Sequence, residues 1–310
     1  MSRAAGGRRV AVLVTCFRQR PQVMRCLEAL SLAAVEAGID PEIHLLDDDG
    51  RDGTREAVMR SFPGARITVG DGSHYWNGGM RRLWLQAAEV GYDDYLWLNS
   101  DTYLLPSALR HLLESAAWVR EREGRDGIVV GAVRDPESGE ISYGGVSRTH
   151  PHRPLSFGRV EPGEEPRRCD TFNGNCLLVP DAVVREIGVL SPEFSHAIGD
   201  TDYGLRAGKA GFGSWVCPHP VGSCRLNLGN GDWARATVPL RRRIRLVLAP
   251  KGLPPREWWV FVRRHTGRGW LWYWVKPYLR VLFPELWSRL TEASRSFRVA
   301  RVFRAIRRGG

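Results

Sequence analysis

The sequence has no apolar run long enough to cross a membrane, and it has few cysteines. A transmembrane helix needs roughly 18 or more consecutive apolar residues, whereas the most apolar segment, residues 270–275, ends at Lys276. The first apolar run, residues 10–14, is too short for the core of a secretory signal peptide. Six cysteines in 310 residues do not form a disulfide framework. We therefore expect a cytoplasmic protein with reduced thiols.

The turn after the first predicted strand contains no glycine. It reads Thr-Cys-Phe-Arg-Gln-Arg-Pro over residues 15–21. A dinucleotide-binding Rossmann domain needs a glycine-rich turn there, because its backbone must approach the pyrophosphate. A Walker phosphate loop is also absent from the sequence. These absences exclude a Rossmann dehydrogenase and a P-loop nucleotidase.

Most of the chain lacks a surplus of positive charge. The formal net charge is +11, yet residues 241–310 hold 18 Lys and Arg against 3 Asp and Glu, which leaves 27 against 31 for residues 1–240. The larger part therefore has a net charge of −4 and no positive surplus for nucleic-acid phosphates. Six of the twelve tryptophans lie in the basic end. We expect no nucleic-acid partner for the body of the protein.

Short apolar runs alternate with amphipathic segments over the first 130 residues. Strands are predicted at 10–15, 42–46, 66–69, 95–98 and 128–133, with helices at 21–38, 54–61, 80–89 and 106–120 between them. This order predicts an α/β fold with a mostly parallel sheet flanked by helices. Residues 134–180 have shorter runs and predict loops and antiparallel strands, and a further helix is predicted at 200–211.

Acidic residues follow two of the predicted strands. Asp47 and Asp48 follow the second strand, and Asp101 follows the fourth. Ligands of open α/β sheets bind beyond the carboxyl ends of the strands. Asp101 could there hold Mg²⁺ or Mn²⁺ bridging a diphosphate, while Asp47 or Asp48 could accept hydrogen bonds from a base or a ribose. The alternative, that each aspartate caps a helix or forms a turn, is less favoured for two clusters than for one.

The motifs, in their order, resemble those of the family 2 glycosyltransferases, which have the GT-A fold. The resemblance covers about residues 9–235 and rests on six segments: Val-Thr at 14–15, the Asp-rich turn at 47–54, Tyr-Trp-Asn-Gly-Gly-Met at 75–80, Asn-Ser-Asp at 99–101, Phe-Asn-Gly-Asn-Cys-Leu-Leu-Val-Pro at 172–180 and Gly-Asp-Thr-Asp-Tyr-Gly-Leu-Arg-Ala at 199–207. It implies a metal-dependent, inverting enzyme that uses a nucleotide-diphosphate sugar. The segments at 76–80 and 199–207 look most like those of bacterial rhamnosyltransferases of polysaccharide assembly, which suggests a UDP or dTDP donor.

The resemblance implies roles for the matching residues. Thr15, Asp47 and Asp48 would contact the nucleoside. Asn99 would lie near the ribose and diphosphate, and Asp101 would bind Mn²⁺ or Mg²⁺. A cation at this place is also what the charge of a diphosphate leaving group requires.

The general base is assigned to the later acidic motif. An inverting displacement needs a carboxylate beside the incoming acceptor hydroxyl. Asp200 and Asp202 point to different sides of a helix, so only one can serve, and the position in the motif favours Asp200.

Four further side chains are candidates for binding the nucleotide sugar, each with a structural alternative. Arg81 could reach a phosphate or lie on a solvated helix face. Trp76 could stack on a base or sugar, or anchor the loop. Asn173 and Asn175 could bind sugar hydroxyls or form a turn.

Two departures from the family pattern leave an alternative function open. Gly199 stands where the family usually has a glutamate, and the position of a metal-binding histidine falls near Cys224 and Arg225, about five residues after His219. The alternative is a catalytically inactive GT-A-fold protein that acts as a membrane-surface or nucleic-acid-binding module.

The C-terminal 70 residues combine arginine with aromatic and aliphatic side chains. Residues 297–308 place apolar side chains on one helical face, edged by arginines. Such segments suit a helix lying in an anionic membrane interface; packing on the catalytic domain is the second interpretation, and nucleic-acid binding the third. We expect a GT-A domain at 1–240, with a nucleotide-sugar half at about 9–133 and an acceptor half at about 134–240. The basic region at 241–310 would hold it at the cytoplasmic face of the membrane, near a glycan or lipid-linked acceptor.

Overall fold

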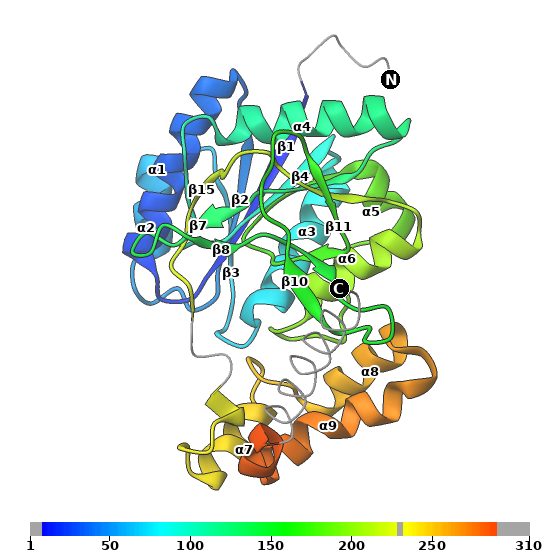
Figure 1. Ribbon diagram of the computed structural model, residues 1–310. Helices are drawn as coiled ribbons and strands as arrows, with labels where there is room; N and C mark the ends of the chain where they lie inside the picture. The colour runs from blue at the N-terminus through cyan, green and yellow to red at the C-terminus, as the bar shows by residue number, and fades with distance from the viewer. Residues whose placement is uncertain (1–7, 228–231, 290–310) are drawn as a thin grey trace. The chain divides into compact units, whose positions relative to one another are not determined.

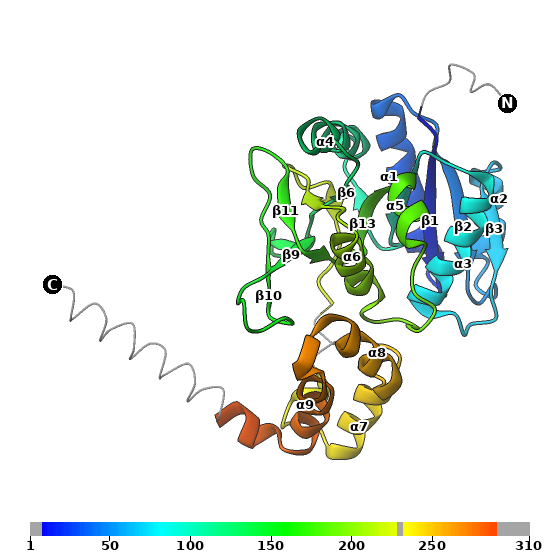
Figure 2. The same cartoon turned by 90° about the vertical axis from the view of Figure 1, so that its right-hand side faces the viewer.

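The computed structural model describes residues 8–227 and 232–289, and the chain divides into two compact units between residues 226 and 227 (Figures 1 and 2). The amphipathic segment predicted at 297–308 lies outside the described residues. The division of functions predicted at residue 240 stays a prediction.

An eight-stranded mixed sheet forms the centre of the first unit. Its strand order is β11 (Arg167–Cys169), β14 (Ser214–Val216), β6 (Ile128–Val130), β13 (Cys176–Pro180), β4 (Asp94–Leu98), β1 (Val10–Cys16), β2 (Glu42–Asp47) and β3 (Arg66–Val69). Strands β4, β1, β2 and β3 are parallel, whereas β13 runs antiparallel between β4 and β6. The predicted α/β fold with a mostly parallel sheet is confirmed.

Helices cover both faces of this sheet (Figure 1). One core contains residues of α1 (Arg20–Ala37), α2 (Thr54–Ser61) and α4 (Ala108–Glu123), and the other contains residues of α3 (Tyr75–Val90), α5 (Asp181–Ile187) and α6 (Gly199–Lys209). Successive residues of β1 alternate between the two cores, as expected for a continuous apolar strand that is buried on both sides. This packing fixes the carboxyl ends of β1, β2 and β4 at one edge.

Two small sheets extend the first unit. One has the order β10 (Phe157–Arg159), β9 (Gly145–Arg148), β12 (Thr171–Phe172). The other has the order β5 (Tyr103–Leu104), β15 (Gly222–Ser223), β7 (Val133–Arg134), β8 (Ile141–Tyr143). The single strand predicted at 128–133 is therefore wrong: the chain leaves the main sheet after β6 and joins the small sheet as β7.

The second unit is helical, with α7 (Leu240–Leu248), α8 (Pro255–His265), a 3₁₀ turn (Gly267–Gly269) and α9 (Trp270–Leu282). Trp258, Phe261 and Val262 of α8 are buried with Val247 and Val281. The indole N–H of Trp258 donates to the carbonyl of Tyr273 at 2.9 Å. In the described parts of the chain, no helix has the length and apolar character needed to cross a membrane.

Candidate active site

Three of the predicted nucleoside ligands lie together at the ends of β1 and β2. The register pairs Thr15 with Leu46 and Cys16 with Asp47, so Asp48 follows directly at the same edge. Asp47 is fully buried, Asp48 is 3% exposed and Thr15 is 9% exposed. One oxygen of Asp47 accepts from the backbone N–H of Gly50 at 3.0 Å. Its other oxygen is buried without a hydrogen-bond partner in the described residues, and is therefore an acceptor in need of a donor.

The Asp48 carboxylate caps helix α3. It accepts from the backbone N–H groups of His74 at 3.0 Å and Tyr75 at 3.2 Å, and from that of Gly72 at 3.3 Å. A carboxylate at a helix N-terminus satisfies donors that have no partner inside the helix. Both oxygens of Asp48 thus accept hydrogen bonds from the protein, which agrees with the alternative that this aspartate caps a helix.

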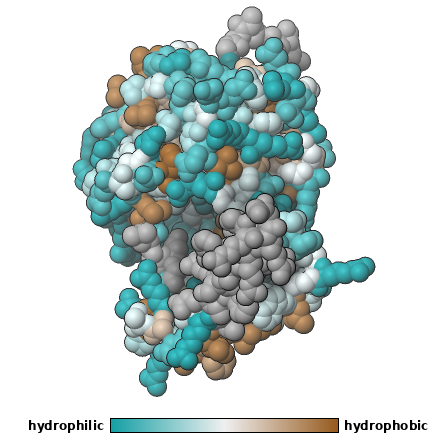
Figure 3. Space-filling model, viewed as in Figure 1, coloured by the Kyte–Doolittle hydropathy of each residue, from teal (hydrophilic) through white to brown (hydrophobic). Residues whose placement is uncertain are grey.

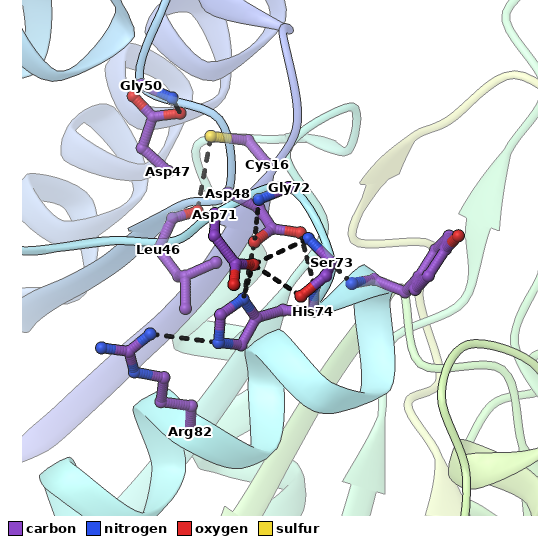
Figure 4. Close-up of polar contacts among 11 residues, drawn as sticks. Cys16, Leu46, Asp47, Asp48, Gly50, Asp71, Gly72, Ser73, His74 and Arg82 are labelled. Atoms are coloured by element: carbon purple, nitrogen blue, oxygen red, sulfur yellow. Dashed lines mark hydrogen bonds and ion pairs between the residues drawn. The ribbon is translucent and has the colours of Figure 1, made fainter.

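His74 links Asp48 to Arg82 (Figure 4). Its Nε2 lies 3.0 Å from a guanidinium nitrogen of Arg82, and because arginine can only donate, Nε2 must accept. The ring proton is therefore on Nδ1, which donates to Asp48 at 2.8 Å. The same ring nitrogen lies 3.4 Å from a carboxylate oxygen of Asp71.

Asp48, Asp71 and His74 also place potential metal-ligand atoms within 4.8 Å of one another. Hydrogen bonds already account for this grouping, since Asp71 accepts from the backbone and hydroxyl of Ser73 and Asp48 accepts from α3. We interpret the group as a cap that orders the residues before α3.

Helix α3 begins at Tyr75, so the start predicted near residue 80 is wrong. Acceptors from a distant loop explain the early start. The carbonyl of Ser195 accepts from the backbone N–H groups of Asn77 at 3.1 Å and Gly78 at 3.3 Å, and Nδ1 of His196 lies 3.4 Å from the backbone nitrogen of Trp76. The residues predicted as a glycine-rich loop therefore form the first turns of the helix, and Gly79 brings that helix onto β1: an added Cβ would lie 2.6 Å from the hydroxyl of Thr15.

Trp76 and Asn99 meet at the end of β4. The indole N–H of Trp76 donates to the side-chain carbonyl of Asn99 at 2.7 Å, which leaves the amide N–H₂ group of Asn99 directed elsewhere. The ring of Trp76 also packs edge-on against Trp97, with centroids 5.8 Å apart. Trp76 is therefore an anchor that orients Asn99, although it remains partly exposed.

Asp101 stands on the turn after β4. The backbone N–H of Thr102 donates to the carbonyl of Asn99 at 2.9 Å, which closes the turn. Asp101 is exposed, and none of the ion pairs in the described parts of the chain includes it. The surrounding protein nevertheless desolvates the carboxyl and raises its pKa.

The two predicted asparagines beside β13 have different surroundings. Asn175 is 7% exposed. Its backbone carbonyl accepts from the backbone N–H of Asn99 at 3.0 Å, and its side-chain amide donates to the sulfur of Cys224 at 3.5 Å. Asn175 thus supports the turn of Asp101. Asn173 is half-buried, and its backbone N–H donates to the carbonyl of Gly144 at 3.0 Å.

Asp200 lies against this group from helix α6. Its carboxylate accepts from the backbone N–H of Gly174 at 2.9 Å and from that of Thr201 at 2.6 Å. Gly174 is where Trp76 and Asp200 converge, because an added Cβ there would lie 2.5 Å from the Trp76 ring and 3.3 Å from Cβ of Asp200. Burial raises the pKa of Asp200, and the two backbone hydrogen bonds oppose this shift.

Asp202 is engaged elsewhere. It is fully buried and forms an ion pair with Arg206 at 2.9 Å, and it accepts from the hydroxyl of Ser191 at 3.1 Å. Of the two neighbouring aspartates, Asp202 is therefore a structural residue and Asp200 is the one that lies beside Trp76.

A steric clash explains why position 199 is a glycine. An added Cβ would lie 1.8 Å from the side-chain carbonyl oxygen of Asn77. Asn77 is fully buried, and its amide donates to the carbonyls of Ser191 at 3.0 Å and Phe194 at 2.6 Å. Asn77 thus fills the space in which a side chain at position 199 would begin, and it fixes the loop before α6.

We expect Gly199→Ala to lower the free energy of unfolding by about 1–3 kcal/mol, because the new methyl group overpacks against Asn77. Gly208→Ala in the same helix is the matched control, since an added Cβ there meets nothing within 4 Å. That change should be neutral or stabilise by about 0.5–1 kcal/mol. Urea unfolding of both variants measures the difference, and equal effects would contradict the steric explanation.

The sequence predictions missed four residues of this site. His74, Asn77 and Cys224 act through contacts with residues far away in the chain, which no local pattern reveals. Phe17 follows β1 and is 47% exposed, and its ring lies near Gly72 in the loop that Asp48 caps. An exposed aromatic residue directly after a buried strand was the available signal for Phe17. His219, considered for a metal role, instead packs against His111 with ring centroids 4.7 Å apart.

Comparisons with known proteins identify the class of enzyme. No family model matches the chain. A protein of Mycobacterium tuberculosis named N-acetylglucosaminyl-diphospho-decaprenol L-rhamnosyltransferase is 26% identical over 233 residues, which are 67% of this chain and 73% of the relative. The same protein from a second strain matches equally well.

Solved structures show the same fold. The mannosyltransferase PcManGT from Pyrobaculum calidifontis, in complex with GDP-Man and Mn²⁺, aligns with a TM-score of 0.55 at 14% identity, over 94% of this chain and 74% of that one. S. aureus TarS 1-349 in complex with UDP-GlcNAc aligns with a TM-score of 0.50 at 13% identity, over 89% and 81%. The chain is a glycosyltransferase with the GT-A fold. It spans 42% of the length of a longer S. aureus TarS chain.

The resemblance to family 2 glycosyltransferases, rhamnosyltransferases among them, is thereby confirmed. The enzyme interpretation is favoured over the inactive-module alternative, because the relative is itself named as a transferase. In this glycosyltransferase, Asn175 contacts both Cys224 and Asn99, and Cys224 lies near Asp101. Asn99 also accepts from Trp76, whose ring lies at Gly174 close to Asp200.

Proposed function

We propose that the protein is an inverting, metal-dependent rhamnosyltransferase. It would transfer rhamnose from a nucleotide-diphosphate donor, with dTDP-rhamnose as the first candidate, to a hydroxyl of a lipid-linked glycan. The observation that carries the proposal is the contact of Trp76 with both Asn99 and the Gly174–Asp200 pair. Through Trp76 it connects Asn99, the proposed donor ligand, with the surroundings of Asp200, the proposed base, although the two lie 101 positions apart in the sequence. The name of the M. tuberculosis relative supports both the sugar and a lipid-linked acceptor.

The nucleoside would bind at the ends of β1 and β2. Asp47 has a buried oxygen that lacks a donor, which a base N–H or a ribose hydroxyl would supply. Thr15 directly precedes Cys16, the residue that pairs with Asp47 in the register, and the exposed ring of Phe17 offers a stacking surface. In this arrangement Asp48 contributes by holding α3 and the loop before it, rather than by spare acceptor capacity.

The diphosphate would lie near Asn99 and Asp101. The amide group that Trp76 directs away from itself is a neutral donor for a ribose or phosphate oxygen. Arg81 adds a second donor, because its Nε is buried without a hydrogen-bond partner among the residues that the structure describes.

The surroundings of Asp101 fit a divalent cation. The carboxylate is exposed and forms no ion pair within the described residues, and its desolvation is a cost that a cation would offset. Mn²⁺ or Mg²⁺ bound there would neutralise charge on the departing diphosphate. Asp101 would hold the cation, and Asn175 would hold the turn on which Asp101 stands.

The acceptor hydroxyl would be deprotonated by Asp200. Backbone N–H groups of Gly174 and Thr201 orient its carboxylate, and burial raises its pKa, which makes it a stronger base than an exposed aspartate. Asn173 directly precedes Gly174 in the sequence, and its neutral polar side chain would bind a sugar hydroxyl.

A donor panel tests the proposal directly. The full chain is incubated with Mn²⁺ and with dTDP-rhamnose, UDP-GlcNAc or GDP-mannose, and thermal stabilisation and transfer to a polyprenyl-diphosphate-linked GlcNAc acceptor are measured. Stabilisation and transfer with the rhamnose donor are expected. Transfer of a different sugar would overturn the choice of rhamnose, and no stabilisation by any nucleoside diphosphate would overturn the function.

We also propose that the second unit binds an anionic membrane surface. Helix α7 exposes Leu240, Ile244 and Leu248, which are spaced four residues apart and form one stripe. Exposed arginines at 241, 242 and 245 flank this stripe. Residues 232–289 hold 13 Lys and Arg against 3 Asp and Glu. An apolar stripe edged by cations suits the boundary between lipid headgroups and acyl chains.

Other apolar side chains of this unit are also exposed. They come from α8, α9 and the residues after α9: Trp259, Leu271, Trp272, Leu282, Phe283 and Leu286. Figure 3 shows apolar side chains in brown beside hydrophilic ones in teal on the visible face of the unit. Trp258 and Phe261 are buried in the packing of this unit, whereas the exposed aromatic side chains remain available for a membrane surface.

Leu248→Glu should reduce co-sedimentation with vesicles of phosphatidylglycerol and phosphatidylcholine by about tenfold or more, because burial of a leucine side chain contributes roughly 1.5–3 kcal/mol. Leu32→Glu is the matched control, since Leu32 is 63% exposed on α1 of the first unit. Equal binding of both variants, or no binding of the unsubstituted chain to anionic vesicles, would contradict the membrane proposal.

A further inference from the structure

Cys224 lies beside Asp101 because of how two short strands pair. Strand β15 runs antiparallel to β5, with Ser223 opposite Tyr103 and Gly222 opposite Leu104. One more step in this register sets Cys224 opposite Thr102, the residue that follows Asp101. The pairing therefore brings a thiol from position 224 to the turn after β4.

Gly222 permits the close approach of these strands. An added Cβ at this position would lie 2.4 Å from the carbonyl oxygen of Tyr103 and 3.2 Å from Cα of Leu104. Any side chain there would push β15 away from β5 and would move Cys224 with it. The backbone thus fixes the thiol beside the turn.

Several polar groups converge on the Cys224 sulfur. The amide of Asn175 donates to it at 3.5 Å. Asp101 directly precedes Thr102, the residue opposite Cys224, and after burial its carboxyl is among the nearby groups that raise the pKa of the thiol. Thr102 is fully buried, and its oxygen makes no well-formed hydrogen bond in the described residues. Thr102 therefore has an unused hydrogen-bonding group at the same turn as Asp101.

Exposure divides these groups into an open side and a closed side. Asp101 is exposed, whereas Cys224 is only 2% exposed and Thr102 is fully buried. A cation bound to Asp101 from the open side would meet the sulfur at the base of the site.

We propose that Cys224 is a second protein ligand of the divalent cation that Asp101 binds. This proposal rests on the metal-dependent function proposed above. Binding of the cation releases the thiol proton to solvent, and the thiolate takes its place in the coordination shell. A site with one carboxylate and one thiolate prefers borderline or soft ions such as Co²⁺, Zn²⁺ and Cd²⁺ over Mg²⁺, because Mg²⁺ favours oxygen ligands.

The other cysteines provide a matched control. All six are free and buried. Cys169 is 5% exposed in β11, where its neighbours are backbone and apolar groups of Gly145 and Val216 rather than Asp101. Cys169→Ala and Cys224→Ala therefore remove the same atoms from sites of similar burial, and only the second should alter metal binding.

Cobalt spectroscopy of the full chain tests the proposal. Co²⁺ is titrated into the protein in the presence of dTDP or UDP, and absorbance is followed in the near-ultraviolet, where a thiolate bound to Co²⁺ gives a charge-transfer band. The band should form in the unsubstituted chain and in Cys169→Ala, and should be absent in Cys224→Ala. We expect the apparent affinity of Cys224→Ala for Co²⁺ to fall about tenfold or more, with a smaller change for Mg²⁺.

The outcomes separate this inference from the proposed function. Metal-dependent stabilisation by a nucleoside diphosphate without a cobalt charge-transfer band would overturn the cysteine ligand and leave the function standing. A band that persists in Cys224→Ala would also overturn it. If neither metal nor nucleoside diphosphate binds the unsubstituted chain, both proposals fail together. Cys224→Ser, closer in size and polarity, is measured beside the alanine variant, and its melting temperature shows whether loss of the band reflects loss of the fold.

Discussion

Asp200→Asn is expected to lower kcat by roughly 10²–10⁴-fold, the usual contribution of a general base. The amide keeps the size of the carboxylate but cannot accept the proton of the acceptor hydroxyl. Donor binding should persist, because the proposed nucleoside and diphosphate ligands lie at the ends of β1, β2 and β4. Initial rates with saturating donor and a thermal shift with dTDP measure the two properties separately.

Asp202→Asn is the informative comparison, because it makes the same change two residues away. Asp202 is buried in an ion pair with Arg206, and removing one partner of a buried pair costs about 3–5 kcal/mol. We expect this variant to lose stability while its folded fraction keeps the chemistry. A large fall in kcat for folded Asp202→Asn, with Asp200→Asn unimpaired, would reverse the assignment.

The pH profile provides a second readout for Asp200. Burial raises the pKa of its carboxyl, and a general base is active only when it is deprotonated. As the pH falls, kcat should therefore decline through a midpoint above about 3.9, the value of an ordinary aspartate. In Asp200→Asn this acidic limb should disappear from the residual activity.

Asp101→Asn is expected to abolish the dependence of activity on Mn²⁺ or Mg²⁺ and to lower kcat/KM by about 10³-fold. Charge neutralisation by a bound cation is worth several kcal/mol in such a transfer, and about 4 kcal/mol corresponds to that factor. The variant should also lose the extra thermal stabilisation that Mn²⁺ adds to a nucleoside diphosphate. Rates and melting temperatures with and without Mn²⁺ and a chelator provide the measurement.

Asp71→Asn distinguishes the two places where a cation could bind. Asp71 lies with Asp48 and His74 in the group whose potential ligand atoms are within 4.8 Å of one another. Hydrogen bonds explain that group, so we expect Asp71→Asn to keep its metal response. Loss of the metal response in this variant, with the response of Asp101→Asn intact, would move the cation to the residues before α3.

The sequence determined the order of elements and the positions of the charged groups. The continuous apolar run of β1 predicts a sheet that is buried on both faces, because every residue of such a strand must be apolar. Acidic residues directly after strands predict the edge at which Asp47 and Asp101 gather, because parallel strands end on the same side. These inferences depend on local periodicity and chain order alone.

Only the tertiary structure decided which polar groups are already occupied. Asp48 reads like a ligand in the sequence, yet its carboxylate caps α3. Asp202 is the less favoured candidate for the general base, and its carboxylate pairs with Arg206. Distance along the chain is the reason: acceptors at 195 and 196 start α3 early, Asn77 requires the glycine at 199, and β15 brings Cys224 to Asp101. A sequence pattern records which donors and acceptors a chain has, whereas long-range packing decides which of them remain for a substrate.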